Sequence, residues 1–104
     1  MKLRIRVNEV RLRLSEDEVA QVAAGGPIVE ATRFSGGALG YRLAFGGDEL
    51  SACFSPAAGI EIKLPRARAA RWAAGGEVSL QGTVDTGGGT LTVLIEKDLK
   101  RDRD

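Results

Sequence analysis

The stretch that decides the fold runs from Ile60 to Val78 and reads Ile-Glu-Ile-Lys-Leu-Pro-Arg-Ala-Arg-Ala-Ala-Arg-Trp-Ala-Ala-Gly-Gly-Glu-Val. Its first residues alternate between apolar and charged, which predicts a half-buried strand. Pro65 suits the first turn of a helix, because its missing N–H would have no partner there. The glycine doublet predicts the end of that helix, and Val78 lies at the start of another strand.

A similar stretch lies 50 residues earlier, from Val10 to Ile28. The offset brings Ala23-Ala24-Gly25-Gly26 onto Ala73-Ala74-Gly75-Gly76 and keeps apolar positions in phase as far as Phe45. A repeat of this length is typical of stacked supersecondary units. We therefore expect one domain, residues 1–104, whose halves, residues 1–46 and 49–96, share a core. Residues 97–104 are expected to form a frayed tail.

Each half contains the same succession of predicted elements. Strands are expected over residues 2–7, 10–14, 27–34, 39–45, 49–55, 60–64, 77–84 and 90–96, with a short helix after the second strand of each half. Ser15 and Glu18 form a capping box for the first helix, and Gly25 ends it. Because each strand has one apolar face, the expected fold is α+β and mostly antiparallel β. Two ββαββ repeats are expected to form one pseudo-twofold small barrel or two-sheet domain.

The first two strands are expected to pair as a tight hairpin. Asn8-Glu9 separates them, and a two-residue turn that begins with Asn suits such a hairpin. This turn places Arg6 opposite Arg11 and Arg4 opposite Arg13 on the outer face of the hairpin.

Composition narrows the classes of function. The net charge is +1, so any basic binding surface must arise from how the charges are distributed. There is no histidine and one cysteine, which excludes an intrachain disulfide and the usual His/Cys metal sites and favours a reducing compartment. The charged, alternating N-terminus is unlike a secretory signal, and no apolar run is long enough to span a membrane. We expect a cytoplasmic protein that uses no cofactor.

Residues 59–96 resemble the swapped-hairpin fold of AbrB-type transition-state regulators and addiction-module antitoxins. In those proteins a strand ending in Ile-Pro leads into a helix, a Gly-Asp box and a β-hairpin, and Leu64-Pro65 and Gly76-Glu77-Val78 stand in those places here. The first half matches less well, with Ser15 in place of the proline and Pro27 after the glycines. The resemblance implies a barrel, which those proteins close from two chains and a tandem copy would close within one.

The two ends of the chain resemble a second family, of small bacterial proteins of unknown function. Those proteins begin with a near-identical basic hairpin, as in residues 1–14, and end in Ile-Glu-Lys-Asp-Phe, often before an acidic tail. Here residues 94–98 read Leu-Ile-Glu-Lys-Asp, Leu99 replaces the phenylalanine, and the tail is of mixed charge. This resemblance implies no assigned activity.

The candidate site is the basic outer face of the first hairpin, formed by Lys2, Arg4, Arg6, Arg11 and Arg13. Like charges directly across a strand pair are destabilising, and the equivalent positions of the second half are not basic apart from Lys63. A guanidinium group fits phosphate oxygens, so the cluster is suited to a nucleic-acid backbone. No aromatic residue interleaves with these arginines in the sequence, which argues against a stacking platform for single strands.

The alternative is that these arginines are structural. Acids from neighbouring strands, such as Glu49, Glu61, Glu96 or Asp98, would then pair with them. In a second cluster, on the later helix, Arg68 and Arg71 share a face while Arg66 lies away from them; this is interpreted as ordinary helix surface. Cys53 is expected to be a packed thiol.

Enzymatic readings are weaker. Without histidine, acid–base chemistry would fall to carboxylates or lysine. Glu61 and Lys63 lie on one face of a strand, a pattern reminiscent of triphosphate tunnel enzymes, which makes a small phosphohydrolase the third reading. No catalytic residue and no metal site is predicted.

The leading hypothesis is a non-enzymatic binding module that binds nucleic acid or another polyanion through the basic hairpin face. The alternative is a protein-interaction or homodimeric assembly module, joined through a sheet edge, in which the arginines are structural.

Overall fold

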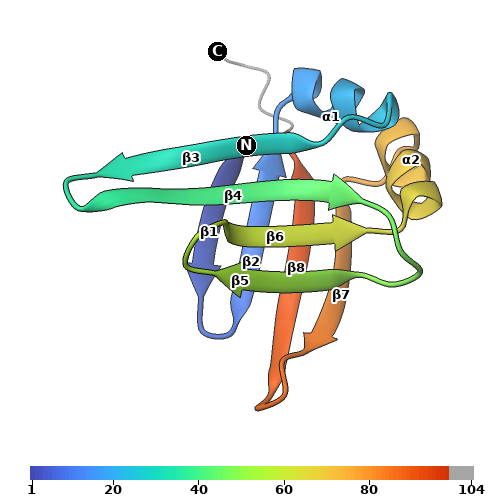
Figure 1. The fold of residues 1–104 in the computed structure, drawn as a ribbon. Helices are drawn as coiled ribbons and strands as arrows, with labels where there is room; N and C mark the ends of the chain where they lie inside the picture. The colour runs from blue at the N-terminus through green and yellow to red at the C-terminus, as the bar shows by residue number, and fades with distance from the viewer. Residues whose placement is uncertain (99–104) are drawn as a thin grey trace.

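Over the part of the chain that it describes, the computed structural model contains two four-stranded β-sheets and two short helices (Figure 1). The structure describes residues 1–98. The elements are, in order, β1 (Lys2–Arg6), β2 (Glu9–Leu14), α1 (Glu16–Ala23), β3 (Ile28–Phe34), β4 (Gly37–Phe45), β5 (Ser51–Ser55), β6 (Gly59–Leu64), α2 (Arg66–Ala74), β7 (Ser79–Asp85) and β8 (Thr90–Lys97).

Each sheet joins a hairpin from the first half of the chain to a hairpin from the second. Sheet A has the order β1-β2-β8-β7 and sheet B the order β3-β4-β6-β5. The central pairs, β2 with β8 and β4 with β6, are parallel, and the outer pairs are antiparallel. The strands of one sheet cross those of the other steeply, and both helices pack together at one end (Figure 1).

This arrangement contradicts the fold class expected from the sequence. The described strands form two mixed sheets, neither of which closes into a barrel. The ββαββ repeat is not a structural unit either, because its two hairpins lie in different sheets. The alternating pattern placed the strands within two residues of their observed bounds. It could not place them in sheets, since alternation shows which face of a strand is buried but not which strand lies beside it. Its usual association with antiparallel pairing also fails at the two central, parallel pairs.

The core fills the space between the sheets and beneath the helices. Apolar side chains from both sheets and both helices meet there, and nine of the larger ones are almost completely buried: Leu12, Leu14, Val22, Leu43, Ile62, Leu64, Trp72, Val93 and Ile95. Burial of each such side chain contributes about 1.5–3 kcal/mol. The buried faces of the core strands are therefore apolar, and most of the charged side chains of the sheets lie on the opposite faces.

Two local signals in the sequence predict the helix ends correctly. The Ser15 side chain accepts a hydrogen bond from the Glu18 backbone N–H, and the Glu18 carboxylate accepts one from the Ser15 backbone N–H, which completes the capping box. Gly25 adopts φ 89° directly after the first helix, a conformation that favours glycine. Pro65 is the N-cap of α2, one position before the first helical residue.

The first hairpin has a different register from the expected one. Val7 and Asn8 form the turn, so that Arg6 lies opposite Glu9 and Arg4 opposite Arg11. A shift of two positions leaves every side chain on the same face, so the apolar pattern could not distinguish the two registers. The neighbouring strand β8 holds Asn8 in the turn: its side-chain amide donates to the Thr90 carbonyl at 2.7 Å, and the Thr92 N–H donates to its carbonyl at 3.0 Å.

The predicted tail begins too early. Lys97 is the last residue of β8, and the Asp98 backbone N–H donates to the Leu14 carbonyl at 2.8 Å. The ammonium group of Lys97 lies 5.2 Å from the centre of the Trp72 ring, a cation–π distance. Residues 99–104, the rest of the predicted tail, lie outside the described residues.

Two glycines let the backbones of sheet B approach closely. Gly59 has φ +86°, and a Cβ atom built on it would lie 2.0 Å from the Gly40 carbonyl oxygen. A Cβ on Gly40 would in turn lie 3.0 Å from the Ala58 carbonyl oxygen. The start of β6 can therefore lie beside β4 only while both positions lack side chains.

We expect Gly59→Ala to lower the free energy of unfolding by on the order of 2–4 kcal/mol, because it combines a backbone clash with an unfavourable φ. Urea denaturation followed by circular dichroism measures this change. Gly88→Ala is the matched control, because nothing lies within 4 Å of that position and its φ is not positive; its effect should stay within about 1 kcal/mol. Equal stabilities of the two variants would contradict the close approach.

Candidate functional site

The five predicted basic residues all lie on β1 and β2, at one side of the outer face of sheet A. Lys2 lies opposite Arg13 and Arg4 opposite Arg11, so like charges face each other in two successive cross-strand pairs. The third pair joins Arg6 to Glu9 and is of opposite charge. The clustering inferred from the sequence is therefore present, with a different set of partners.

The neighbouring strand brings acids to part of this cluster. One oxygen of Glu96, on β8, lies 3.5 Å from an Arg13 terminal nitrogen and 3.9 Å from Arg11 Nε. Glu9 lies 3.5 Å from an Arg11 terminal nitrogen. These distances exceed the roughly 2.7–2.9 Å of a strong charge-assisted hydrogen bond. The Nε of Arg11 is shielded from solvent and has no hydrogen-bond partner among the described residues.

The remaining cations differ in their surroundings. Lys2 Nζ lies 3.8 Å from Asp98, an acid that we expected from the sequence beside the arginines instead. Within residues 1–98, no carboxylate lies within 4.0 Å of Arg4 or Arg6. Both residues belong to β1, the outermost strand of sheet A. The acids thus pair with Lys2, Arg11 and Arg13, whereas Arg4 and Arg6 have no carboxylate partner in this part of the chain.

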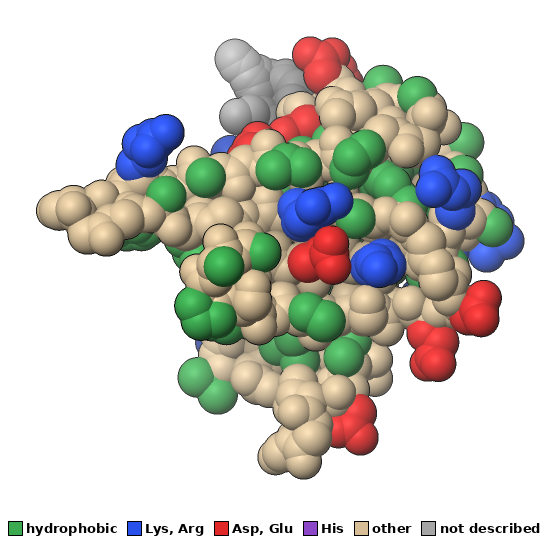
Figure 2. Space-filling model, viewed as in Figure 1, with side chains coloured by type: hydrophobic (Ala, Val, Ile, Leu, Met, Phe, Trp, Pro, Cys, Tyr) green, Lys and Arg blue, Asp and Glu red, His purple; other side chains and the backbone are tan. Residues whose placement is uncertain are grey.

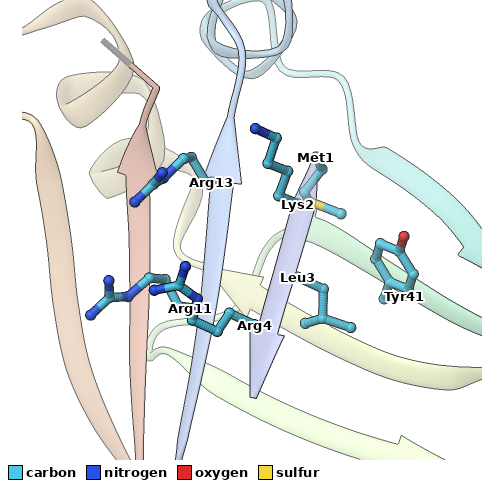
Figure 3. A pocket seen from close by; sticks show the side chains of 7 residues that line it. All are labelled: Met1, Lys2, Leu3, Arg4, Arg11, Arg13 and Tyr41. Carbon is cyan, nitrogen blue, oxygen red and sulfur yellow. The ribbon is translucent and has the colours of Figure 1, made fainter. Parts of the chain in front are cut away.

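A hollow of about 440 Å³ opens beside these residues (Figure 3). Two kinds of side chain line the hollow. Cationic groups of Lys2, Arg4, Arg11 and Arg13 line one part, and Met1, Leu3 and Tyr41 line the other. In Figure 3, Leu3 and Tyr41 lie on one side of β1 and the arginines on the opposite side. The hollow therefore extends over the edge strand rather than lying on one flat face.

Tyr41 is the residue that sequence reasoning missed. It comes from β4, in the other sheet, and its hydroxyl lies 3.0 Å from the Thr32 hydroxyl. Its alternation within β4 showed that it faces inward, but no local signal shows that the edge of β1 would lie beside it. No aromatic residue lies among these arginines in the sequence, but in the folded protein Tyr41 borders the same hollow as they do.

The N-terminal amino group anchors β1 at the rim of this hollow. It forms ion pairs with Glu18 of α1 and Glu30 of β3. Burial by itself would lower the pKa of the amine, but its hydrogen bonds to the two carboxylates more than offset this and raise the pKa above its ordinary value. Burial would likewise raise the pKa of Glu18, yet its bonds to the amine and Ser15 lower that pKa.

The cluster on α2 forms a separate, smaller site. Arg68 and Arg71 line a hollow of about 370 Å³, and Arg66 is not part of that lining, as the helical spacing predicted. Arg68 donates a hydrogen bond to the Gln81 carbonyl at 3.1 Å. Arg68 therefore connects α2 to the edge strand β7.

The outer face of sheet B shows none of this concentration of charge. Arg42 and Glu61 pair there at 3.3 Å, so Glu61 lies beside Arg42 and not beside the basic hairpin. Basic and acidic side chains are interspersed on this face (Figure 2). Cys53 is exposed, and its expected packing is wrong, because the inner face of β5 carries Ala52 and Phe54 instead.

No group of three or more potential metal ligands occurs within residues 1–98. In the same part of the chain, no helix has the length and apolar character needed to cross a membrane.

Comparison with known proteins places the chain in a family. Residues 1–103 match the family of unknown function DUF7009, and the chain belongs to that family. No curated protein and no solved structure is significantly similar to it. The prediction of a family of unknown function is therefore confirmed.

From the ion pair between the amine and Glu18 we predict that stability falls both at high pH (the alkaline limb) and at low pH (the acid limb). Because the pKa of the amine is raised on folding, its contribution is present below about pH 8 and is lost as the pH rises through the raised value. Because the pKa of Glu18 is lowered, its contribution is present above about pH 4 and is lost as the pH falls through the lowered value. Urea midpoints measured from pH 3 to pH 10 should fall at both ends.

Glu18→Gln should flatten the acid limb and weaken the alkaline limb, to which Glu30 still contributes, since glutamine keeps a capping side chain but not the charge. Glu16→Gln, on the exposed side of the same helical turn, is the control and should retain them. Identical pH profiles for the two variants would show that the ion pairs of the amine do not stabilise the fold.

Proposed function

We propose that this protein is a non-enzymatic binding module that binds a phosphate-bearing polyanion, such as a nucleic-acid backbone, through Lys2, Arg4, Arg6, Arg11 and Arg13. The observation that carries the proposal is that two arginines of the cluster have no acidic partner. Arg4 and Arg6 have no carboxylate within 4.0 Å in the described part of the chain, and Arg4 borders the hollow.

The spacing of the cations supports a regular polyanion as ligand. Arg4 and Arg6 are two residues apart on one strand, which separates their attachment points by roughly 7 Å. A nucleic-acid strand is a regular row of phosphates, so two arginines at this separation can contact phosphates of the same strand. Arg11 lies on the adjacent strand, roughly 5 Å away, and extends the basic surface sideways.

The acids beside Arg11 and Arg13 are compatible with this role. Partly exposed ion pairs contribute about 0–1 kcal/mol each, so they hold the side chains weakly and a phosphate can compete for them. A guanidinium group has five N–H donors, and the one or two long contacts that each arginine makes here do not occupy all of them. The Glu96 carboxylate also relieves the repulsion between Arg11 and Arg13 when no ligand is bound.

The test is fluorescence anisotropy with labelled nucleic acid at several salt concentrations. Arg4→Ser/Arg6→Ser should weaken binding and reduce the slope of log affinity against log salt by about 1.8, or 0.9 for each lost phosphate contact. The control, Arg33→Ser/Lys63→Ser, removes the same charge from sheet B and should keep the wild-type slope. Absence of wild-type binding at low salt, or equal losses in both variants, would refute the proposal.

A second candidate function is that of a protein-interaction or assembly module. It is favoured by an apolar groove of about 410 Å³ where sheet B ends at β5, lined from both sheets by residues that include Val10, Ile60 and Leu91. Phe54 borders the groove and is 66% exposed. Exposed apolar surface beside an edge strand suits association with another chain.

Light scattering coupled to size-exclusion chromatography tests the homodimer. If assembly uses the β5 edge, the wild type should dimerise at high concentration, and Phe54→Ser should shift it toward monomer. Val29→Ser is the control, since Val29 is 64% exposed on the opposite edge of sheet B. A monomeric wild type at every concentration would contradict homodimeric assembly.

The remaining expectations belong to the same proposal. A cytoplasmic location is supported by the single, exposed cysteine, which suits a reducing compartment. The resemblance of residues 59–96 to AbrB-type regulators stays a prediction, and the proposed binding does not depend on it.

A further inference from the structure

We infer that the hollow over β1 binds an unpaired nucleotide of single-stranded nucleic acid, with its phosphate against the arginines and its base against Tyr41. This inference rests on the proposed polyanion binding and assigns the class of ligand. The basis is the juxtaposition, within one hollow, of cations from β1 and β2 with an aromatic ring from β4 (Figure 3).

The lining of the hollow matches the two chemistries of a nucleotide. Its volume of about 440 Å³ falls in the range of small-molecule sites, which runs from about 300 to 1,000 Å³. Arg4, Arg11 and Arg13 supply forked donors that fit phosphate oxygens. Leu3 and Tyr41, across the strand, supply apolar and aromatic surface for a base. A simple polyphosphate would use only the first part of this lining.

Tyr41 is held in place before any ligand binds. Its neighbours in sheet B are Glu30 on β3 and Ile60 on β6, so the residue lies within a paired strand and not on a loop. Its hydroxyl hydrogen-bonds with Thr32, which fixes the far end of the ring. A ring with few rotamers loses little entropy when a base stacks on it, and such stacking accounts for about a 5- to 150-fold gain in affinity.

The position of β1 at the edge of sheet A favours an unpaired base over a duplex. One side of its backbone has no strand partner, so N–H and C=O groups there are available to the polar edge of a base. In a duplex those base edges are paired and the base faces are stacked, so neither can enter the hollow without unpairing. A single strand can place its phosphates on one side of β1 and a base on the other.

The experiment compares four probes by anisotropy or competition: a labelled single strand, the corresponding duplex, an abasic single strand of the same length, and inorganic polyphosphate. The wild type should bind the single strand about 5- to 150-fold more tightly than the abasic strand. Tyr41→Ala should abolish this difference. Tyr41→Phe, which keeps the ring, should retain it. Arg4→Ser/Arg6→Ser should weaken binding of all four probes.

The outcomes separate this inference from the function it rests on. Equal affinities of wild type for the single and abasic strands, or a duplex bound as tightly as the single strand, would refute the inference and leave polyanion binding standing. Failure to bind any probe, polyphosphate included, would refute both. Since the wild-type comparison of single and abasic strands needs no variant, the inference remains testable even if Tyr41→Ala does not fold.

Discussion

The parallel pairing of β2 with β8 is the interaction on which the rest of the structure depends. It joins residues 9–14 to residues 92–97, so sheet A forms only when the two ends of the described chain meet. The same pairing places Thr90 and Thr92 beside Asn8, and their bonds to Asn8 set the turn of the first hairpin. It also places Glu96 next to Arg13. The fold, the hairpin register and the charge balance of the candidate site therefore share one cause.

The arginines of sheet A differ in whether an acid lies beside them. Toward the centre of the sheet, Arg11 and Arg13 have acids within 4 Å, and the repulsion between them is relieved. Toward the edge, Arg4 and Arg6 have no such neighbour among the described residues, although the N-terminal amine at the start of the same strand pairs with two carboxylates. The fold thus uses acids to anchor the strand at its beginning and leaves Arg4 and Arg6 available further along it.

Local signals predicted the elements but not their assembly. The capping box at Ser15 and the turn glycine Gly25 act through neighbouring residues, and both lie where the sequence indicated. The choice of strand partners depends on chain segments up to about 80 residues apart, for which a period of two residues carries no information. The two-residue period does show which face of its strand each side chain occupies, so the outward direction of the basic residues was predictable. It does not show which residues lie opposite each other, so the pairing of Arg4 with Arg11 was not.

The aromatic component of the site shows why residue spacing in the sequence is a poor guide to a binding surface. Tyr41 lies 28 positions after Arg13 and in the other sheet, yet it borders the same hollow because the sheets cross steeply and β1 passes beside β4. In an aligned pair of sheets the strands of the two sheets run within about 30° of each other, so an edge strand of one sheet crosses few strands of the other. Steep crossing instead exposes successive strands of sheet B to the edge of sheet A. The crossing angle, which neither half of the chain encodes alone, is thus what combines cationic and aromatic groups in one place.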